Sequence, residues 1–121
     1  MLDIQGALKN LQSTVTRHFL HIQNQHPFMR AWAVQFELAY TDFRVVQLAL
    51  QLAEETALLQ EFTGAYDKVY QYESAFAFDG LEGFNAKYAA DMDNYEKAKD
   101  DLLAVIDRIF KLQPDDPNDL I

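Results

Sequence analysis

Apolar residues recur three and four positions apart in the first part of the chain, which is typical of one face of an α-helix. From Asp3 to about residue 24 they form a single stripe. Its members are Ile4, Leu8, Leu11, Val15, His18 and Ile22. Pro27 disfavours helical geometry in the residue before it, so this helix is expected to end between Asn24 and His26.

The next segment, about 27–62, predicts one long helix with apolar stripes on two sides. No glycine or proline interrupts it, and an uninterrupted helix of this length would measure roughly 54 Å. The first stripe keeps an unbroken 3-4 spacing: Met29, Trp32, Phe36, Ala39, Phe43, Val46, Leu50, Ala53 and Ala57. The second lies about 140° around the helix and contains Ala31, Val34, Leu38, Val45, Leu48, Leu52, Leu59 and Phe62.

A helix that is apolar on two sides is expected to be buried on two sides. Either the long helix is the centre of a bundle, or its second face packs against a second copy or another protein. Between the two stripes runs a narrow polar strip whose members stand seven residues apart: Arg30, Glu37, Arg44 and Gln51.

The rest of the chain predicts two further helical segments and one loop. Residues 63–78 suit a helix, the stretch "DGLEG" at 79–83 is the clearest loop signal, and a last helix begins near Phe84 and ends at Pro114. We therefore predict an all-α bundle of three to four antiparallel helices in residues 1–113. Residues 114–121 are predicted to form a short acidic tail.

Charge narrows the range of partners. The net charge is −9, and it is uneven: residues 1–44 carry 4 basic and 3 acidic side chains, whereas residues 45–121 carry 6 basic and 16 acidic ones. Such a balance disfavours direct binding to nucleic acids or anionic membranes and favours a protein partner, a basic one in particular.

Neither a secretory signal nor a membrane span is expected. The N-terminus lacks a basic start followed by an apolar run, and the most apolar stretch, residues 45–53, is too short to cross a bilayer. The 121 residues include no cysteine, which excludes disulfides and thiolate chemistry and is compatible with a reducing compartment. We expect a cytoplasmic protein.

The three histidines offer the only candidate metal ligands of note. His18 and His21 are three residues apart on the first helix, so both could contact one ion. The simpler explanation is that His18 lies in the core stripe, that His21 interacts with the helix dipole, and that His26 marks the helix end. No Glu-x-x-His motif of a di-iron bundle is present. We predict no cofactor and keep metal binding as an alternative.

Catalytic motifs are also missing. Neither Ser13 nor Ser74 lies in a Gly-x-Ser-x-Gly turn, and the four glycines form neither a P-loop nor a dinucleotide fingerprint. The sequence therefore predicts that the protein is not an enzyme.

Aromatic and acidic residues suggest two surfaces. Tyr66, Tyr70, Tyr72 and Glu73 belong to a tyrosine-rich segment, in which Tyr72 lies off the local stripe and is expected to be exposed beside acidic side chains. Such a surface would suit an Arg- or Lys-rich partner. A second acidic face is expected along the last helix, at Asp91, Asp93, Glu96, Asp100 and Asp101.

These observations favour a non-enzymatic protein-interaction module, an adaptor, chaperone-like or inhibitory partner that also forms homodimers. The predicted interaction residues are Leu38, Val45 and Leu52 on the second apolar stripe, together with the tyrosine segment. One alternative is an inhibitor whose acidic face imitates the charge of nucleic acid and blocks a nucleic-acid-binding protein. Another is a helical bundle that binds a metal or ligand through His18 and His21.

Overall fold

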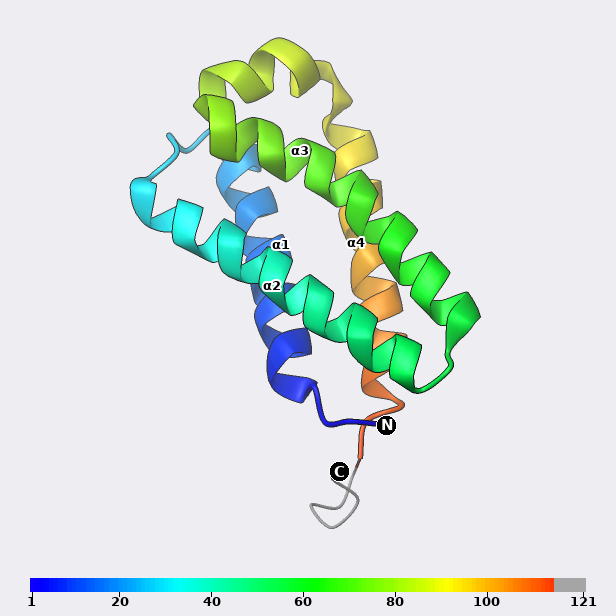
Figure 1. The fold of residues 1–121 in the computed structure, drawn as a ribbon. Coiled ribbons are helices and arrows are strands. Elements are labelled where there is room, and N and C mark those ends of the chain that lie inside the picture. Colours follow the sequence, from blue (N-terminus) through cyan, green and yellow to red (C-terminus); the bar gives the residue numbers. More distant parts are fainter. Residues whose placement is uncertain (115–121) are drawn as a thin grey trace.

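In the computed structural model, which describes residues 1–114, every regular element is helical. Helix α1 spans Gln5–Gln23, α2 spans Arg30–Leu52, α3 spans Thr56–Tyr88 and α4 spans Met92–Phe110, with a 3-10 turn, η1, at Ala89–Asp91. Successive helices run antiparallel, and the start of α1 and the end of α4 lie at the same end of an elongated bundle (Figure 1). The predicted all-α bundle is confirmed. The predicted acidic tail, apart from Pro114, lies outside the described residues.

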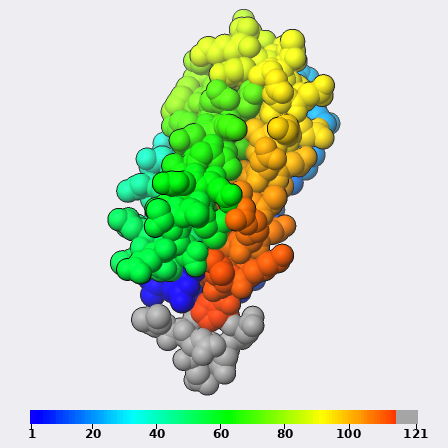
Figure 2. All heavy atoms as spheres, turned by 90° about the vertical axis from the view of Figure 1, so that its right-hand side faces the viewer, coloured from blue at the N-terminus to red at the C-terminus, as the bar shows by residue number. Residues whose placement is uncertain are grey.

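The four helices form a ring in which each packs against its neighbours in sequence. Helix α4 returns to pack against α1, and α3 and α4 lie side by side along one face of the molecule (Figure 2). Helix α1 also contacts α3 across the centre, whereas no contact joins α2 to α4 in residues 1–114. Helices α2 and α4 therefore occupy the two outer corners of the ring.

The predicted continuous helix over residues 27–62 is wrong. Pro27 precedes α2 rather than starting it, and α2 ends at Leu52 in a tight turn before α3 begins. The 3-4 stripe continues through the turn by coincidence, because Ala57 is exposed. The core positions shift to Leu58 and Phe62, which face back towards α2.

The turn after α2 carries no glycine, although its geometry is one that glycine favours. The Glu55 N–H donates to the Leu50 carbonyl at 3.0 Å and the Glu54 N–H to the Gln51 carbonyl at 3.1 Å, and Glu54 has φ = 59°. This is the Schellman pattern, whose left-handed position is usually Gly. Helix α1 ends in the same way, with Gln25 at φ = 56°.

The predicted loop at 79–83 is a sharp bend within a helical run. Only Gly80, at φ 70° and ψ −170°, leaves helical geometry, a region open almost only to glycine. A Cβ at Gly83 would lie 2.1 Å from the Cβ of Asp79, so the bend also depends on a second glycine. Residues 56–110 are thus helical without an intervening coil, and they fold back on themselves at Gly80 and η1.

The core is apolar and aromatic along the length of the bundle. All six members of the first stripe, Ile4 to Ile22, are buried, as predicted. The fully buried side chains with the largest volume come from α1, α3 and α4, with one from α2: Tyr95, Phe62, Phe76, Phe84, Leu8, Leu11, Ile22, Leu50, Leu102, Ile106, Ile109 and His18.

Candidate interaction surface

An exposed apolar stripe runs along the outer face of α2. Its aliphatic side chains have high exposed fractions: 61% for Val34, 58% for Leu38, 39% for Val45, 52% for Leu48 and 71% for Leu52. Ala31 and Thr41 fill the remaining places of the same 3-4 spacing and are also exposed. We call these seven residues the α2 stripe.

The opposite stripe of α2 is buried against α1 and α3. It includes Trp32, Phe36, Ala39, Phe43, Val46 and Leu50. Helix α2 is therefore not the central helix of the bundle, and of the two explanations for its double apolar pattern the first is wrong. Leu59 and Phe62, which the sequence placed in the second stripe, belong to α3 and pack against the core.

The position of α2 in the ring accounts for its wide outward face, because a corner helix packs against only two neighbours along its length. Helix α4 occupies the other corner, and its exposed side is charged, with Asp93, Lys97 and Asp100 all exposed. Only one of the two corners thus combines exposure with an apolar surface. Single exposed apolar residues are ordinary on a protein surface, whereas a contiguous row of them marks an interaction site.

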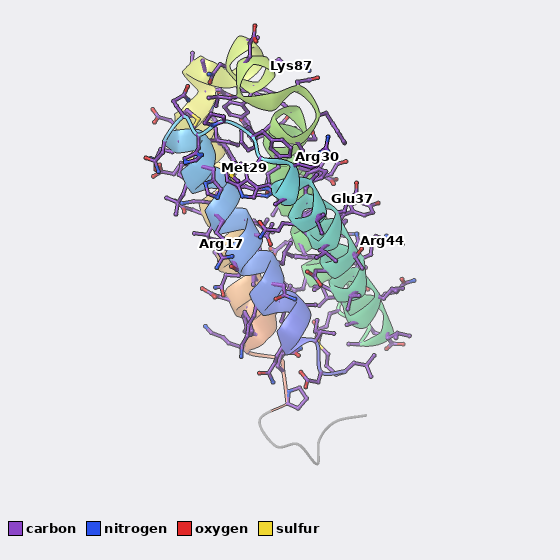
Figure 3. The ribbon with its side chains drawn as sticks, turned by 90° about the vertical axis from the view of Figure 1, so that its left-hand side faces the viewer. Arg17, Met29, Arg30, Glu37, Arg44 and Lys87 are labelled. Atoms are coloured by element: carbon purple, nitrogen blue, oxygen red, sulfur yellow. The ribbon has the colours of Figure 1, made fainter. Side chains whose placement is uncertain are left out.

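Charged side chains line one edge of the α2 stripe. Arg30, Glu37 and Arg44 follow one another along this edge of the helix (Figure 3), and all three are exposed. The Arg44 guanidinium donates to Gln47 Oε1 within the same helix. Neither Glu37 nor Arg44 forms an ion pair within residues 1–114.

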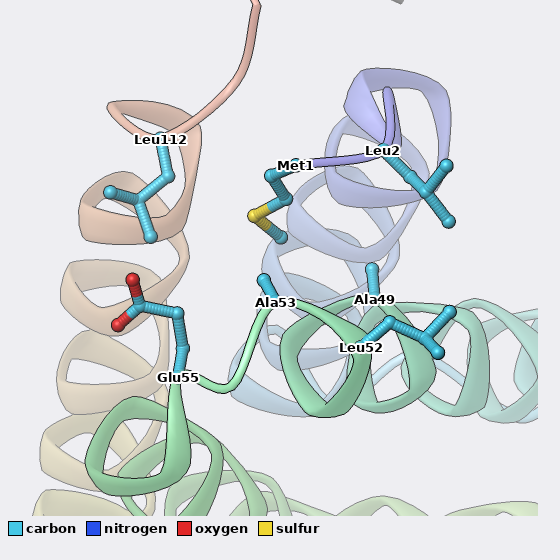
Figure 4. A pocket seen from close by; sticks show the side chains of 7 residues that line it. All are labelled: Met1, Leu2, Ala49, Leu52, Ala53, Glu55 and Leu112. Atoms are coloured by element: carbon cyan, nitrogen blue, oxygen red, sulfur yellow. The ribbon is translucent and has the colours of Figure 1, made fainter. Parts of the chain in front are cut away.

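The stripe ends at an open pocket of about 570 Å³. Leu52 borders the pocket, and the first residues of the chain and Leu112 close it from the other side (Figure 4). The lining comprises Met1, Leu2, Ala49, Leu52, Ala53, Glu55 and Leu112. Glu55 supplies the one ionisable side chain in this lining, and Leu52 connects the pocket to the α2 stripe.

The predicted tyrosine surface is wrong for three of its four members. Tyr66 is buried and stacks on Phe43 with the ring centroids 3.9 Å apart. Tyr72 is also buried, stacked on Tyr95 at 4.6 Å, and its hydroxyl donates to Asp91 Oδ2 at 2.7 Å. Burial, with this hydrogen bond, raises the pKa of Tyr72 to about 12. Tyr70 is half-buried.

Glu73, the fourth member, lies in the core. Its Oε2 is 2.6 Å from His18 Nδ1, and both side chains are buried. The stripe of α3 could have located it, because Tyr66, Val69, Glu73 and Phe76 are spaced 3, 4 and 3. Nε2 of His18 has no hydrogen-bond partner among the described residues.

The His21 side chain lies among other aromatic rings. Its ring stacks on Trp32 with a centroid distance of 3.8 Å and lies near His26. Burial lowers the pKa of His21, and the nearby His26, His18 and Arg17 lower it further. Residues 1–114 contain no group of three or more His, Asp or Glu side chains placed to hold a metal ion.

The predicted acidic face of α4 is exposed but interrupted. Asp93, Glu96, Asp100 and Asp101 are all exposed. Lys97 and Lys99 stand among them, and Lys99 Nζ pairs with Asp100 at 3.1 Å. Asp91 is instead engaged by Tyr72 and by Asn94, and these two hydrogen bonds lower its pKa.

Two exposed aromatic residues were not singled out from the sequence. Tyr40 lies on α2, and Phe78 lies on α3 just before the Gly80 bend; their rings contact Tyr70 and Phe36 respectively. Helical spacing alone gave no signal for Phe78, because the bend two residues later exposes it.

None of the described helices is long and apolar enough to cross a membrane. No protein-family model, no curated protein and no solved structure matches this chain. What bears on its function is therefore the geometry and chemistry of its surfaces.

Proposed function

We propose that this protein acts without catalysis, by binding another protein through the α2 stripe, as an adaptor, a chaperone-like protein or an inhibitory partner. The observation that supports the proposal is the row of five exposed aliphatic side chains on one corner helix. Covering such a row removes its apolar surface from water, which favours association by roughly 25 cal/mol for each Å².

The proposal is tested by substituting Leu38→Glu and Leu48→Glu together. Both side chains are exposed, so the folded chain tolerates the change, and circular dichroism checks that it does. Tagged wild-type and variant proteins are used to capture partners from lysate of the native host. We expect capture by the wild type and its loss in the variant, because two charges at the centre of the stripe would be buried on binding.

A matched control is Leu20→Glu, since Leu20 is an exposed leucine on α1, outside the α2 stripe. The control variant should capture the same proteins as the wild type. Capture that the α2 variant leaves unchanged, or that the Leu20 variant abolishes equally, contradicts the proposal.

The two alternatives have less support. The acidic row of α4 is interrupted by lysines, one of which already pairs with it, so an imitation of nucleic-acid charge is not favoured. His18 is buried and the His21 ring stacks on Trp32, so joint metal binding by these two side chains is not favoured.

A further inference from the structure

The α2 stripe has the spacing of a coiled-coil seam. Ala31, Val34, Leu38, Thr41, Val45, Leu48 and Leu52 follow the 3-4 alternation of the heptad a and d positions over three heptads, and all seven are exposed. Such a seam fits into the same seam on another helix. Its length is roughly 32 Å, from 21 residues at 1.5 Å each.

The flanking charges specify which helix can pair with it. Arg30, Glu37, Arg44 and Gln51 each directly precede an a position and so occupy the g positions. On the other flank, Gln35, Asp42 and Ala49 directly follow the d positions and so occupy e. Charges at e and g set the partner and the orientation of a coiled coil.

We propose that a second copy of this chain packs antiparallel on the α2 stripe, about a two-fold axis near residue 40. This inference rests on the proposed function and names the partner. A two-fold axis normal to the plane of the two helices brings the g flank of one copy against the g flank of the other. Glu37 then faces Arg44 of the second copy, and Arg44 faces its Glu37. Both side chains are exposed and lack an ion-pair partner within residues 1–114.

Other arrangements of the same two helices bring like charges together. A parallel pair places g against e, and Glu37 would then face Asp42. An antiparallel pair shifted by one heptad places Arg44 against Arg44, and a shift the other way places Glu37 against Glu37. Like charges at an interface suppress the wrong partner or register. The charges at the g positions therefore favour the antiparallel arrangement in which Glu37 faces Arg44.

Charge-swap variants test the register by sedimentation equilibrium. The wild type is expected to be dimeric. Glu37→Arg and Arg44→Glu, each alone, should weaken the dimer roughly tenfold or more, because each creates two like-charge contacts. The double variant Glu37→Arg/Arg44→Glu should dimerise as tightly as the wild type. An equimolar mixture of the two single variants should form a dimer that contains one copy of each. Arg30→Glu is the matched control on the same flank, since it faces the neutral Gln51 and should have little effect.

Cross-linking tests whether the two copies are antiparallel. Because the chain has no cysteine, a single introduced cysteine is the only site that a thiol reagent can join. Thr41→Cys lies near the proposed axis and should cross-link between copies through a short bis-maleimide. Leu52→Cys should not, because the two positions would be roughly 36 Å apart along the helices. A parallel dimer would cross-link at both positions.

A monomeric wild type at high concentration overturns the inference, as do single charge variants that remain dimeric or a Leu52→Cys chain that cross-links with itself. None of these results contradicts the proposed function. That proposal fails only if the Leu38→Glu/Leu48→Glu variant captures other proteins as well as the wild type does. Conversely, a dimer with the expected pairing stands even where no other protein is captured.

Discussion

His18 and Glu73 bring two ionisable side chains into an apolar core. Their hydrogen bond of 2.6 Å joins α1 to α3 across the centre of the ring. A buried pair of this kind is costly to break and contributes little net stability compared with apolar residues of similar size. The effects of the two residues on the free energy of unfolding are therefore coupled, because each side chain satisfies the buried polar group of the other.

We expect Glu73→Leu or His18→Leu alone to lower the free energy of unfolding by about 3–5 kcal/mol, because each leaves a polar group buried without its partner. The double variant His18→Leu/Glu73→Leu should cost far less than the sum of the two. Urea denaturation of the four proteins measures this coupling. Additive effects would contradict the cooperative role of the pair.

The pKa of His21 predicts how stability responds to acid. Because burial and neighbouring positive charges lower this pKa in the folded protein, the unfolded chain binds a proton more readily. The protonation of His21 therefore leaves the free energy of unfolding unchanged above the ordinary histidine pKa of about 6.5, and it lowers this free energy as the pH falls below that value.

A His21→Gln variant should therefore lose less stability than the wild type between about pH 7.5 and pH 5.5, the interval that brackets the ordinary histidine pKa. Chemical denaturation at several pH values compares the two proteins. Equal losses in both would show that His21 does not contribute to the acid sensitivity.

At the scale of the elements, the ends of the helices were the hardest feature to predict. The stripes of α1 and α2 were correctly located, because burial of one face dictates helical spacing. The break between α2 and α3 was missed because Glu54 occupies the left-handed position where glycine gives the usual signal. Backbone hydrogen bonds of the turn accompany this conformation, and the sequence contains no residue type there that signals it.

Two of the three glycines of α3, Gly80 and Gly64, should respond in opposite ways to alanine. Gly80→Ala is expected to cost about 1–3 kcal/mol, because its backbone conformation is nearly closed to other residues. Gly64→Ala should instead stabilise by about 0.5–1 kcal/mol, because Gly64 is helical with open space around its Cβ.

Thermal unfolding of these two variants provides the measurement, and each serves as the control for the other. Should Gly80→Ala be neutral, the bend within α3 would not depend on the left-handed backbone of this residue.

At the scale of the whole molecule, the sequence predicted the fold class and the exposed residues of α2 but not the position of buried polar groups. Leu38, Val45 and Leu52 are exposed as a second apolar face requires, since the other face of α2 fills the core. Tyr72 was expected at the surface because it lies off the local stripe, and Glu73 was placed beside it as an acidic residue. Both are buried instead, where Asp91 and His18 provide their hydrogen-bond partners. Such pairings join helices distant in sequence, so a pattern within one helix cannot reveal them.

The two ends of the described chain are tied together. The Ile4 N–H donates to Gln113 Oε1 at 2.7 Å, and the Gln5 side chain donates to the Pro114 carbonyl at 3.3 Å. Residue 114 and the first residues of the chain therefore lie close enough to be joined by a short linker. A circular permutant that joins residue 114 to residue 1 through a short linker and opens at the 53–55 turn would begin with α3 and end with α2. Chain ends that lie close together tolerate such rearrangement, and the α2 stripe would then be carried on a helix with a free end.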